Sequence, residues 1–344
     1  MFIRNAWYIA AWADELTDKP LARRILDEPV VLFRDRAGHA AAIADRCCHR
    51  GTPLSLGEVV EQGLQCGYHG MVFDGTGKCV HIPGQDRIPG KAAVPSYPLV
   101  ERDHFLWIWM GAAAQADPAR IPDASYHNDP EWPERHGRLQ IAGSYLLMVD
   151  NLMDLTHLGY VHRRTIGGNP SQHVDAKMET VLTEVGLCFT RWMLDSPPPP
   201  TYVRAYGFKG RIDRWQEFNW VAPSNVLQWN GAKDAGTGAY EGNRDGGFQF
   251  RVFHGLTPET ETSCHYYFAT ANHWAPRYDA ASDQFFRESR ETFLEDKTVI
   301  DGQQARLSEF GEDWLVDIVS DATRVRMRRI LDHMLADEQK LAAE

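Results

Sequence analysis

The sequence contains no long apolar run and no cluster of basic residues. No stretch approaches the roughly 20 apolar residues that a helix needs to cross a bilayer, and the start of the chain shows no apolar leader. Acidic residues outnumber basic ones, 47 against 36, which gives a net charge of −11 and disfavours nucleic-acid binding. We therefore expect a cytoplasmic protein with neither a membrane nor a nucleic acid as its partner.

Cysteine is too scarce for a disulfide framework, and a dinucleotide-binding fingerprint is missing. Only six cysteines occur in 344 residues. Cys79, Cys188 and Cys264 lie in strand-like segments, where small buried hydrophobic side chains are expected. No G-x-G-x-x-G follows a predicted strand, so a flavin or nicotinamide cofactor would have to be bound by another protein.

One short segment holds two mixed cysteine–histidine pairs. Cys47-x-His49 and Cys66-x-x-His69 are separated by sixteen residues. Two thiolates and two imidazoles are the ligands of a [2Fe–2S] cluster with cysteines on one iron and histidines on the other. A Cys2His2 zinc site uses the same ligand types, but it usually pairs the two cysteines in one loop. The mixed pairs favour the cluster over zinc.

A second pair of histidines, His157 and His162, lies in a predicted helix from about Met148 to Gly159 and just beyond it. On a regular helix the two side chains would point about 140° apart. They can bind one metal only if the helix is broken or bulged between them, and Gly159 is the expected place. The alternative is a core helix whose histidines are simply hydrogen-bonded.

A distant carboxylate completes this pattern. The buried face of a predicted helix is marked by apolar residues seven apart, and Asp296 lies on that face within ~60° of them. Its charged neighbours are expected to point to solvent: Glu295, Lys297 and Asp301. An inward carboxylate needs a metal or a cation. Asp296 is therefore either the third ligand of a two-histidine, one-carboxylate Fe(II) site or the ion-pair partner of an arginine such as Arg287.

The motifs D-R-C-C-H-R-G…C-G-Y-H-G, N-L-M-D-L-T-H-L-G-Y-V-H and F-L-E-D-K resemble the oxygenase component of Rieske non-haem iron oxygenases. Within them the chain is most similar to the vanillate and dicamba O-demethylase group, which shares N-A-W-Y, K-P-L-A-R and L-T-P-E-T-E. The resemblance runs from Asn5 to about Arg306. Cys48 departs from it, since family members usually carry proline there. The resemblance implies a [2Fe–2S] cluster and a mononuclear Fe(II).

The predicted elements indicate an α+β protein with two domains. Short strands with regular turns fill residues 1–112, and the resemblance makes this unit an all-β Rieske [2Fe–2S] domain. Residues 113–344 contain an antiparallel sheet and helices, which the resemblance identifies as a helix-grip (START-like) catalytic domain. The expectations that bear most on the site are strands over 139–145, 180–194 and 202–208, an exposed turn at Pro197–Pro200, a mobile loop over 231–247, and helices over 283–308 and 321–340.

Two residues next to the histidines receive roles through the resemblance. It implies a head-to-tail homotrimer in which the cluster of one subunit supplies electrons to the iron of its neighbour. Asp154 would then hydrogen-bond to His69 across the interface and shorten the electron path. Asn151, one turn earlier, would lie near the iron. Otherwise Asp154 is an interfacial or helix-surface charge.

Substrate contacts are expected on the sheet that faces the iron. His254 ends an alternating apolar stripe, and the resemblance implies that it contacts a substrate carboxylate. A buried core histidine is the alternative. Val221 and Arg287 stand where dicamba demethylases carry an asparagine and a tryptophan, and an inward Arg287 could bind a carboxylate or sulfonate.

The implied reaction is O2-dependent oxidation, with demethylation of a methoxylated aromatic acid as the expected outcome. Electrons from NAD(P)H would arrive through a separate reductase, with or without a ferredoxin. The alternatives are a ring-hydroxylating Rieske dioxygenase and a Rieske electron-transfer protein. The latter would need only the first third of the chain, and it leaves Asp296 and both helix histidines unexplained.

Overall fold

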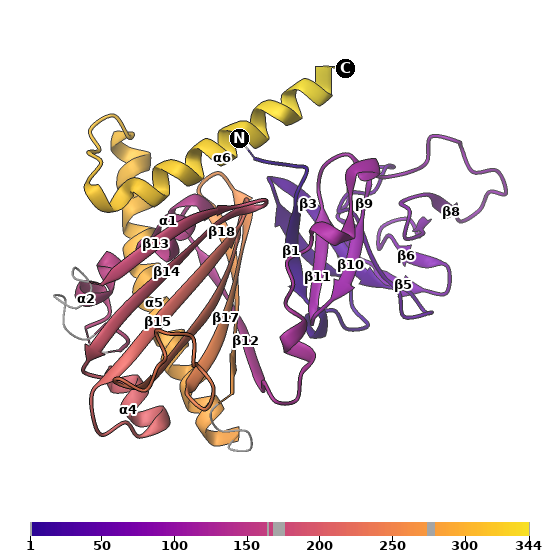
Figure 1. Ribbon diagram of the computed structural model, residues 1–344. Coiled ribbons are helices and arrows are strands. Elements are labelled where there is room, and N and C mark those ends of the chain that lie inside the picture. Colours follow the sequence, from indigo (N-terminus) through magenta and orange to yellow (C-terminus); the bar gives the residue numbers. More distant parts are fainter. Residues whose placement is uncertain (1, 164, 168–175, 274–278, 344) are drawn as a thin grey trace. The chain divides into compact units, whose positions relative to one another are not determined.

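The computed structural model describes residues 2–163, 165–167, 176–273 and 279–343. The chain forms two units, Met1–Asp123 with Thr257–Glu261, and Ala124–Leu256 with Thr262–Glu344. The first unit is built of strands, and the second combines a large sheet with helices (Figure 1). The α+β class expected from the sequence is confirmed.

Three antiparallel sheets make up the first unit, in the strand orders β1-β11-β10, β2-β3-β4-β9 and β5-β6-β7-β8. β1 and β11 are buried along their whole length, because both consist almost entirely of apolar and aromatic residues. The strands are β1 (Trp7–Trp12), β2 (Leu21–Ile25), β3 (Glu28–Arg34), β4 (Ala40–Ala44), β5 (Glu58–Val60), β6 (Gly63–Gln65), β7 (Val72–Phe73), β8 (Cys79–His81), β9 (Ser96–Tyr97), β10 (Leu99–Arg102) and β11 (Phe105–Trp109).

The segment that follows β11 stays with the first unit. Trp7 Nε1 donates a hydrogen bond to the carbonyl oxygen of Asp117, and the Arg120 guanidinium lies 5.2 Å from the ring centroid of Trp109. The unit therefore continues to Asp123, beyond the boundary that the sequence places after residue 112. The loop-like composition of this segment conceals these contacts. Its 3-10 turns are η3 (Ala113–Gln115) and η4 (Pro118–Arg120), and those before it are η1 (Ala13–Glu15) and η2 (Leu54–Leu56).

A seven-stranded antiparallel sheet forms the second unit, in the order β12-β18-β17-β16-β15-β14-β13. Its strands are long, and most residues of the central ones are buried, which indicates that both faces of the sheet are largely covered there. The strands are β12 (Glu134–Ile141), β13 (Lys177–Thr183), β14 (Gly186–Ser196), β15 (Ile212–Val221), β16 (Asn225–Asp234), β17 (Phe248–Thr260) and β18 (Ser263–Asn272).

The long helix α5 (Asp279–Phe310) packs against β12, β18, α1 (Tyr145–Met153) and α4 (Pro200–Tyr206). Figure 1 shows it crossing one face of the sheet. The expected helices over 283–308 and 321–340 are confirmed as α5 and α6 (Ala322–Ala343). The described helices include none that is long and apolar enough to cross a membrane. The short helical segments are η5 (Ser125–Asn128), η6 (Leu155–His157), α2 (Leu158–Val161) and η7 (Val319–Asp321).

Several expected strands are wrong or differ in their bounds. Residues 202–208 lie mostly in α4, because Pro200 at the first helical position has the backbone angle that a helix needs there. Its cap, Pro199, is buried, so the expected turn is only partly exposed. The strand expected over 180–194 is a hairpin of β13 and β14. The strand expected over 139–145 ends at Ile141, and Ser144 caps α1.

The glycine-rich segment after β16 packs against the sheet. β16 continues to Asp234, and the remaining residues of the expected loop form turns. The Arg244 guanidinium lies 4.6 Å from the ring centroid of Trp229, and Ala239 is fully buried. Trp229 alternates with the cavity-lining residues of β16, so the segment covers the outer face of the sheet. It contributes no residue to the cavity described below.

Candidate metal centres and substrate cavity

The two cysteine–histidine pairs lie on neighbouring loops of the first unit, before β5 and between β6 and β7. Cys47 and Cys66 are buried, whereas His49 and His69 are exposed with ring centroids 4.6 Å apart. Burial, and then the adjacent Cys66, raise the pKa of the Cys47 thiol to about 11, so this sulfur needs a metal to be held as a thiolate. Inner sulfurs and outer imidazoles fit the donor set of a [2Fe–2S] cluster.

Both loops turn in the same way. Gly51 donates its backbone N–H to the carbonyl of Cys47, at 2.9 Å, and Gly70 does so to Cys66, at 3.1 Å. The two glycines have φ values of +74° and +70°, which residues with a Cβ rarely adopt. Each cysteine therefore begins a tight turn that a glycine closes four residues later.

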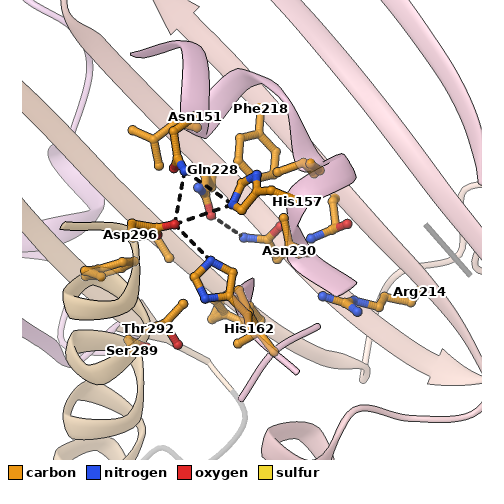
Figure 2. Close-up of a pocket in the computed structure, with 18 of the residues that line it drawn as sticks. Asn151, His157, His162, Arg214, Phe218, Gln228, Asn230, Ser289, Thr292 and Asp296 are labelled. Carbon is orange, nitrogen blue, oxygen red and sulfur yellow. Dashed lines mark hydrogen bonds and ion pairs between the residues drawn. The ribbon is translucent and has the colours of Figure 1, made fainter. Parts of the chain in front are cut away.

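In the second unit, His157, His162 and Asp296 come together. One ligand atom from each lies within 4.8 Å of the others. Asp296 Oδ1 is 3.0 Å from His162 Nε2 and 3.5 Å from His157 Nε2 (Figure 2). Asp296 and His162 are buried, and His157 is about one-fifth exposed. The sequence therefore predicted the members of this cluster, including the carboxylate from a distant helix.

The helix break that aligns the histidines lies earlier than expected. α1 ends at Met153, and the Asp154 carboxylate accepts a hydrogen bond from the N–H of Thr156, at 2.8 Å, which starts a new turn. His157 ends this 3-10 turn, and His162 caps α2 with non-helical angles. Gly159 lies inside α2, so the expected break at Gly159 is wrong. The cap at Asp154 interrupts the helix instead.

Each histidine is held by its other ring nitrogen. His157 Nδ1 donates to the carbonyl oxygen of Asp154, at 2.6 Å, and His162 Nδ1 donates to the Glu295 carboxylate, at 2.7 Å. Both Nε2 atoms are thereby aimed at Asp296. The sequence predicted that Glu295 points to solvent, and this is wrong. Its side chain is long enough to bend from the side of the helix to His162. Asp301 also deviates, since it accepts the N–H of Ala142.

The ionisation state of Asp296 makes this cluster suitable for binding a cation. Burial alone would raise the pKa of Asp296, but hydrogen bonds and charge from His157 and His162 lower it to about 2. Burial would lower the pKa of His162, and the neighbouring Asp296 and Glu295 outweigh it and raise that pKa. An ionised carboxylate beside two imidazoles matches the ligand set of mononuclear non-haem Fe(II).

Asn151 and Asp154 flank the cluster. Asn151 Nδ2 donates to Asp296 Oδ1, at 3.1 Å, so Asn151 lies at the metal site as expected (Figure 2). The Asp154 carboxylate caps the turn before His157 and is partly exposed. Its contact with His69 of a second subunit stays a prediction.

A cavity opens beside the three ligands. The centres of water molecules can occupy about 70 Å³ of this cavity. That space is enough for several water molecules, and therefore for a small ring. Nine leucine, isoleucine, valine and phenylalanine side chains line it, and apolar atoms form most of its wall. Four polar side chains from β15 and β16 also line it, namely Arg214, Gln216, Gln228 and Asn230.

None of the three expected substrate contacts is among the described residues that line this cavity. His254 is fully buried with its Nδ1 2.6 Å from the Tyr266 hydroxyl, and burial lowers its pKa to about 3, so the imidazole is neutral. Val221 ends β15. Arg287 is exposed on α5, so neither an inward Arg287 nor its ion pair with Asp296 is observed.

Two family models match the chain. The Rieske [2Fe-2S] domain matches residues 6–98, and the vanillate O-demethylase oxygenase C-terminal domain matches residues 141–337. The second match alone covers more than half of the 344 residues. Together they account for both metal-binding clusters.

Known proteins resemble the chain over nearly its full length. The toluene-4-sulfonate monooxygenase system iron-sulfur subunit TsaM1 of Comamonas testosteroni is 39% identical, over 98% of both chains. The vanillate O-demethylase oxygenase subunit of Pseudomonas sp. (strain HR199 / DSM 7063) is 37% identical, over 99% of this chain and 97% of that one.

A solved structure agrees with these relatives. The crystal structure of dicamba monooxygenase bound to 3,6-dichlorosalicylic acid superposes with a TM-score of 0.91 and 35% identity, over 100% of this chain and 99% of that one. The same enzyme has also been solved with non-haem iron and dicamba. The chain thus belongs to the Rieske non-haem iron oxygenases, as the oxygenase component of a monooxygenase whose C-terminal domain is of the vanillate O-demethylase type.

Proposed function

We propose that this chain catalyses the O2-dependent O-demethylation of a methoxylated aromatic acid. The observation that carries the proposal is the buried cluster of His157, His162 and Asp296 beside a mostly apolar cavity of single-ring size. The names of the relatives support it, since vanillate and dicamba O-demethylases remove a methyl group from an aromatic acid.

The donor sets assign the two metal sites. Cys47, His49, Cys66 and His69 would hold the [2Fe–2S] cluster, while His157, His162 and Asp296 would hold the mononuclear iron. When bound, the cluster supplies single electrons and the Fe(II) activates O2 as co-substrate.

The protein itself orients the ligands and shapes the cavity. Glu295 fixes the ring of His162, and the Asp154 carbonyl fixes the ring of His157. Asn151 holds the Asp296 carboxylate from the cavity side. The apolar walls exclude water and place the methoxy carbon of the substrate near the ligand atoms. The hydroxylated methoxy group then collapses to formaldehyde and a phenol.

The remaining components follow from the proposal. A separate NAD(P)H-dependent reductase, with or without a ferredoxin, would supply the electrons. The functional unit would be a cytoplasmic homotrimer in which Asp154 bridges to the His69 of a neighbouring subunit.

The experiment is a formaldehyde-release screen with the holoenzyme, a surrogate reductase and a panel of methoxybenzoates. We expect formaldehyde and the matching phenol in equal amounts. Asp296→Ala should abolish both products and leave the visible absorption of the cluster unchanged. Glu291→Ala is the matched control, because Glu291 is exposed on the same helix.

Other outcomes would contradict the proposal. Ring diols without formaldehyde would indicate a ring-hydroxylating dioxygenase. A protein that holds a reducible cluster, binds no second iron and forms no product would be an electron carrier.

A further inference from the structure

The cavity contains a buried cation, Arg214, that no carboxylate of the described residues neutralises. Arg214 on β15 is 4% exposed, and its Nε has no hydrogen-bond partner among the described residues. None of those residues forms an ion pair with it either. Its guanidinium carbon lies 4.8 Å from the ring centroid of Tyr202, which also lines the cavity. A buried charge without a counter-charge is costly, so a ligand that supplies the opposite charge is bound favourably there.

The strand register places further polar groups beside Arg214. Gln216 follows it on the same face of β15, and Asn230 of β16 lies directly opposite Gln216. Gln216 Oε1 and Asn230 Oδ1 are both buried, and neither has a hydrogen-bond partner in the part of the chain that the structure describes. In Figure 2 the Arg214 side chain extends from its strand into the cavity, on the side away from Asp296 in that view. Rotation of the Gln216 carboxamide presents either an N–H or an oxygen to a ligand. Asn230 Nδ2 donates one N–H to Gln228 Oε1, at 3.0 Å, and its second N–H remains for a ligand.

A second arginine adds to the positive charge. Arg191 of β14 lies opposite Gln216, is 3% exposed, and donates to the Leu155 carbonyl, at 3.3 Å. Burial and then the charge of Arg214 lower the pKa of Arg191 to about 10, against a smaller opposing effect of Asp154. Two cations on adjacent strands therefore repel each other, and an anion in the cavity relieves that repulsion.

We propose that Arg214 binds the anionic group of the substrate and thereby selects single-ring aromatic carboxylates or sulfonates over neutral rings. The anion is held between Arg214, Gln216 and Asn230, and the ring extends from there towards the metal ligands. The two residues expected to take this role do not serve it, since His254 is neutral and Arg287 is exposed. The inference rests on the proposed function, and it adds the residue that sets substrate charge.

The test measures binding without turnover, by calorimetric titration of the oxidised holoenzyme. The probes are 4-methoxybenzoate, toluene-4-sulfonate and, as a neutral ring, methoxybenzene. Arg214→Gln should weaken binding of the anion that the protein uses by about 10- to 100-fold, because a charge-assisted contact is lost. Binding of methoxybenzene should stay unchanged. Comparing the two anions in the unaltered protein shows which acid is preferred.

Two further variants sharpen the result. Arg214→Lys keeps the charge but loses the planar fork, so it should bind anions with intermediate affinity. Arg251→Gln is the matched control, since Arg251 alternates with the cavity residues Phe250 and Val252 and stacks on Trp229, at 5.2 Å, on the other face. It should bind all three probes as the unaltered protein does.

The outcomes separate this inference from the proposed function. Equal binding of anions by Arg214→Gln and the unaltered protein would overturn the inference, and so would equal affinity of the unaltered protein for charged and neutral rings. That second comparison needs no variant, so it can overturn the inference even if Arg214→Gln and Arg214→Lys fail to fold. Arg214-dependent anion binding without formaldehyde release would support the inference and refute the demethylation.

Discussion

At the residue scale, His162 lies between two carboxylates with different tasks. Asp296 is directed at the nitrogen, Nε2, that would bind the metal, and Glu295 accepts a hydrogen bond from the opposite nitrogen, Nδ1. Thr165 Oγ1 also donates to Glu295, at 3.1 Å, so that carboxylate is itself fixed. Adjacent residues of one helix thus provide one proposed metal ligand, Asp296, and the hydrogen-bond partner that orients another, His162.

Glu295→Ala should lower the affinity for iron by about 10- to 100-fold, because the His162 ring loses the partner that orients it. Competitive chelation of the mononuclear iron measures the change, and the visible absorption of the cluster should not alter. Glu291→Ala on the same helix should keep full affinity. Equal iron affinity in Glu295→Ala and the unaltered protein would mean that the hydrogen bond does not orient the ligand.

The two carboxylates also show what periodicity can and cannot predict. Helical spacing predicted that Asp296 faces inward, because its Cβ direction is fixed by the helix. It assigned Glu295 to solvent, since spacing ignores how far a flexible side chain can bend. The sequence did not predict Arg214 as a cavity residue, for a different reason. Its alternation with Gln216 and Phe218 places the three on one face of β15, but only the packing of the sheet shows that this face lines the cavity.

At the element scale, α1 carries a charged side chain at a partly buried position. Asp150 pairs with Arg328 of α6, and its Oδ1 has no hydrogen-bond partner among the described residues. Burial raises the pKa of the Asp150 carboxyl from 3.8 to about 6, although Arg328 and Arg324 act to lower it. α1 is therefore joined to α6 by an ion pair that forms fully only above that pH.

The free energy of unfolding should fall as the pH rises from about 4 to about 6. The unfolded chain ionises Asp150 near pH 3.8, while the folded one keeps it protonated until about pH 6, so ionisation favours the unfolded state in that interval. The loss is up to about 3 kcal/mol. Asp150→Asn should lose this part of the pH dependence in urea titrations, beside a constant cost for the unpaired Arg328. An unchanged slope would contradict the raised pKa.

Close contact between strands predicts a second effect at this scale. A Cβ on Gly231 of β16 would lie 2.1 Å from the Trp215 ring and 2.6 Å from the Phe248 carbonyl oxygen. Gly231→Ala should therefore reduce the free energy of unfolding by about 1–3 kcal/mol, or prevent folding. Gly210→Ala is the control, since no atom lies within 4 Å of its Cβ. Similar urea midpoints for both variants would be the contrary result.

Elements were predictable where a single pattern dominated. α5 and the central strands followed from their apolar spacing. Part of α4 was predicted as a strand, because Tyr202, Val203 and Tyr206 favour strands. The proline at its first position favours a helix start, and the segment forms a helix. The break before His157 depended on one side-chain hydrogen bond from Asp154, which local propensity does not reveal.

At the scale of the whole molecule, the proposed trimer predicts that two inactive variants restore each other. Cys47→Ser should lose the cluster and keep the iron site, while Asp296→Ala should do the reverse. Coexpression gives mixed trimers in which the cluster of one subunit can serve the iron of its neighbour, so formaldehyde release should return in part. Mixing the separately purified trimers is the control and should remain inactive. No recovery in mixed trimers would place electron transfer within one subunit.

The tip of the β17–β18 hairpin determines how the first unit can be expressed by itself. Thr257–Glu261 groups with the first unit, where the carbonyl oxygens of Pro258 and Glu259 accept the N–H groups of Leu26 and Asp27, and the Thr257 hydroxyl donates to the Ile9 carbonyl. A plasmid that encodes residues 1–123 alone omits these acceptors. Such a fragment would expose the β2–β3 turn to water, so the iron–sulfur module is best produced as part of the intact polypeptide.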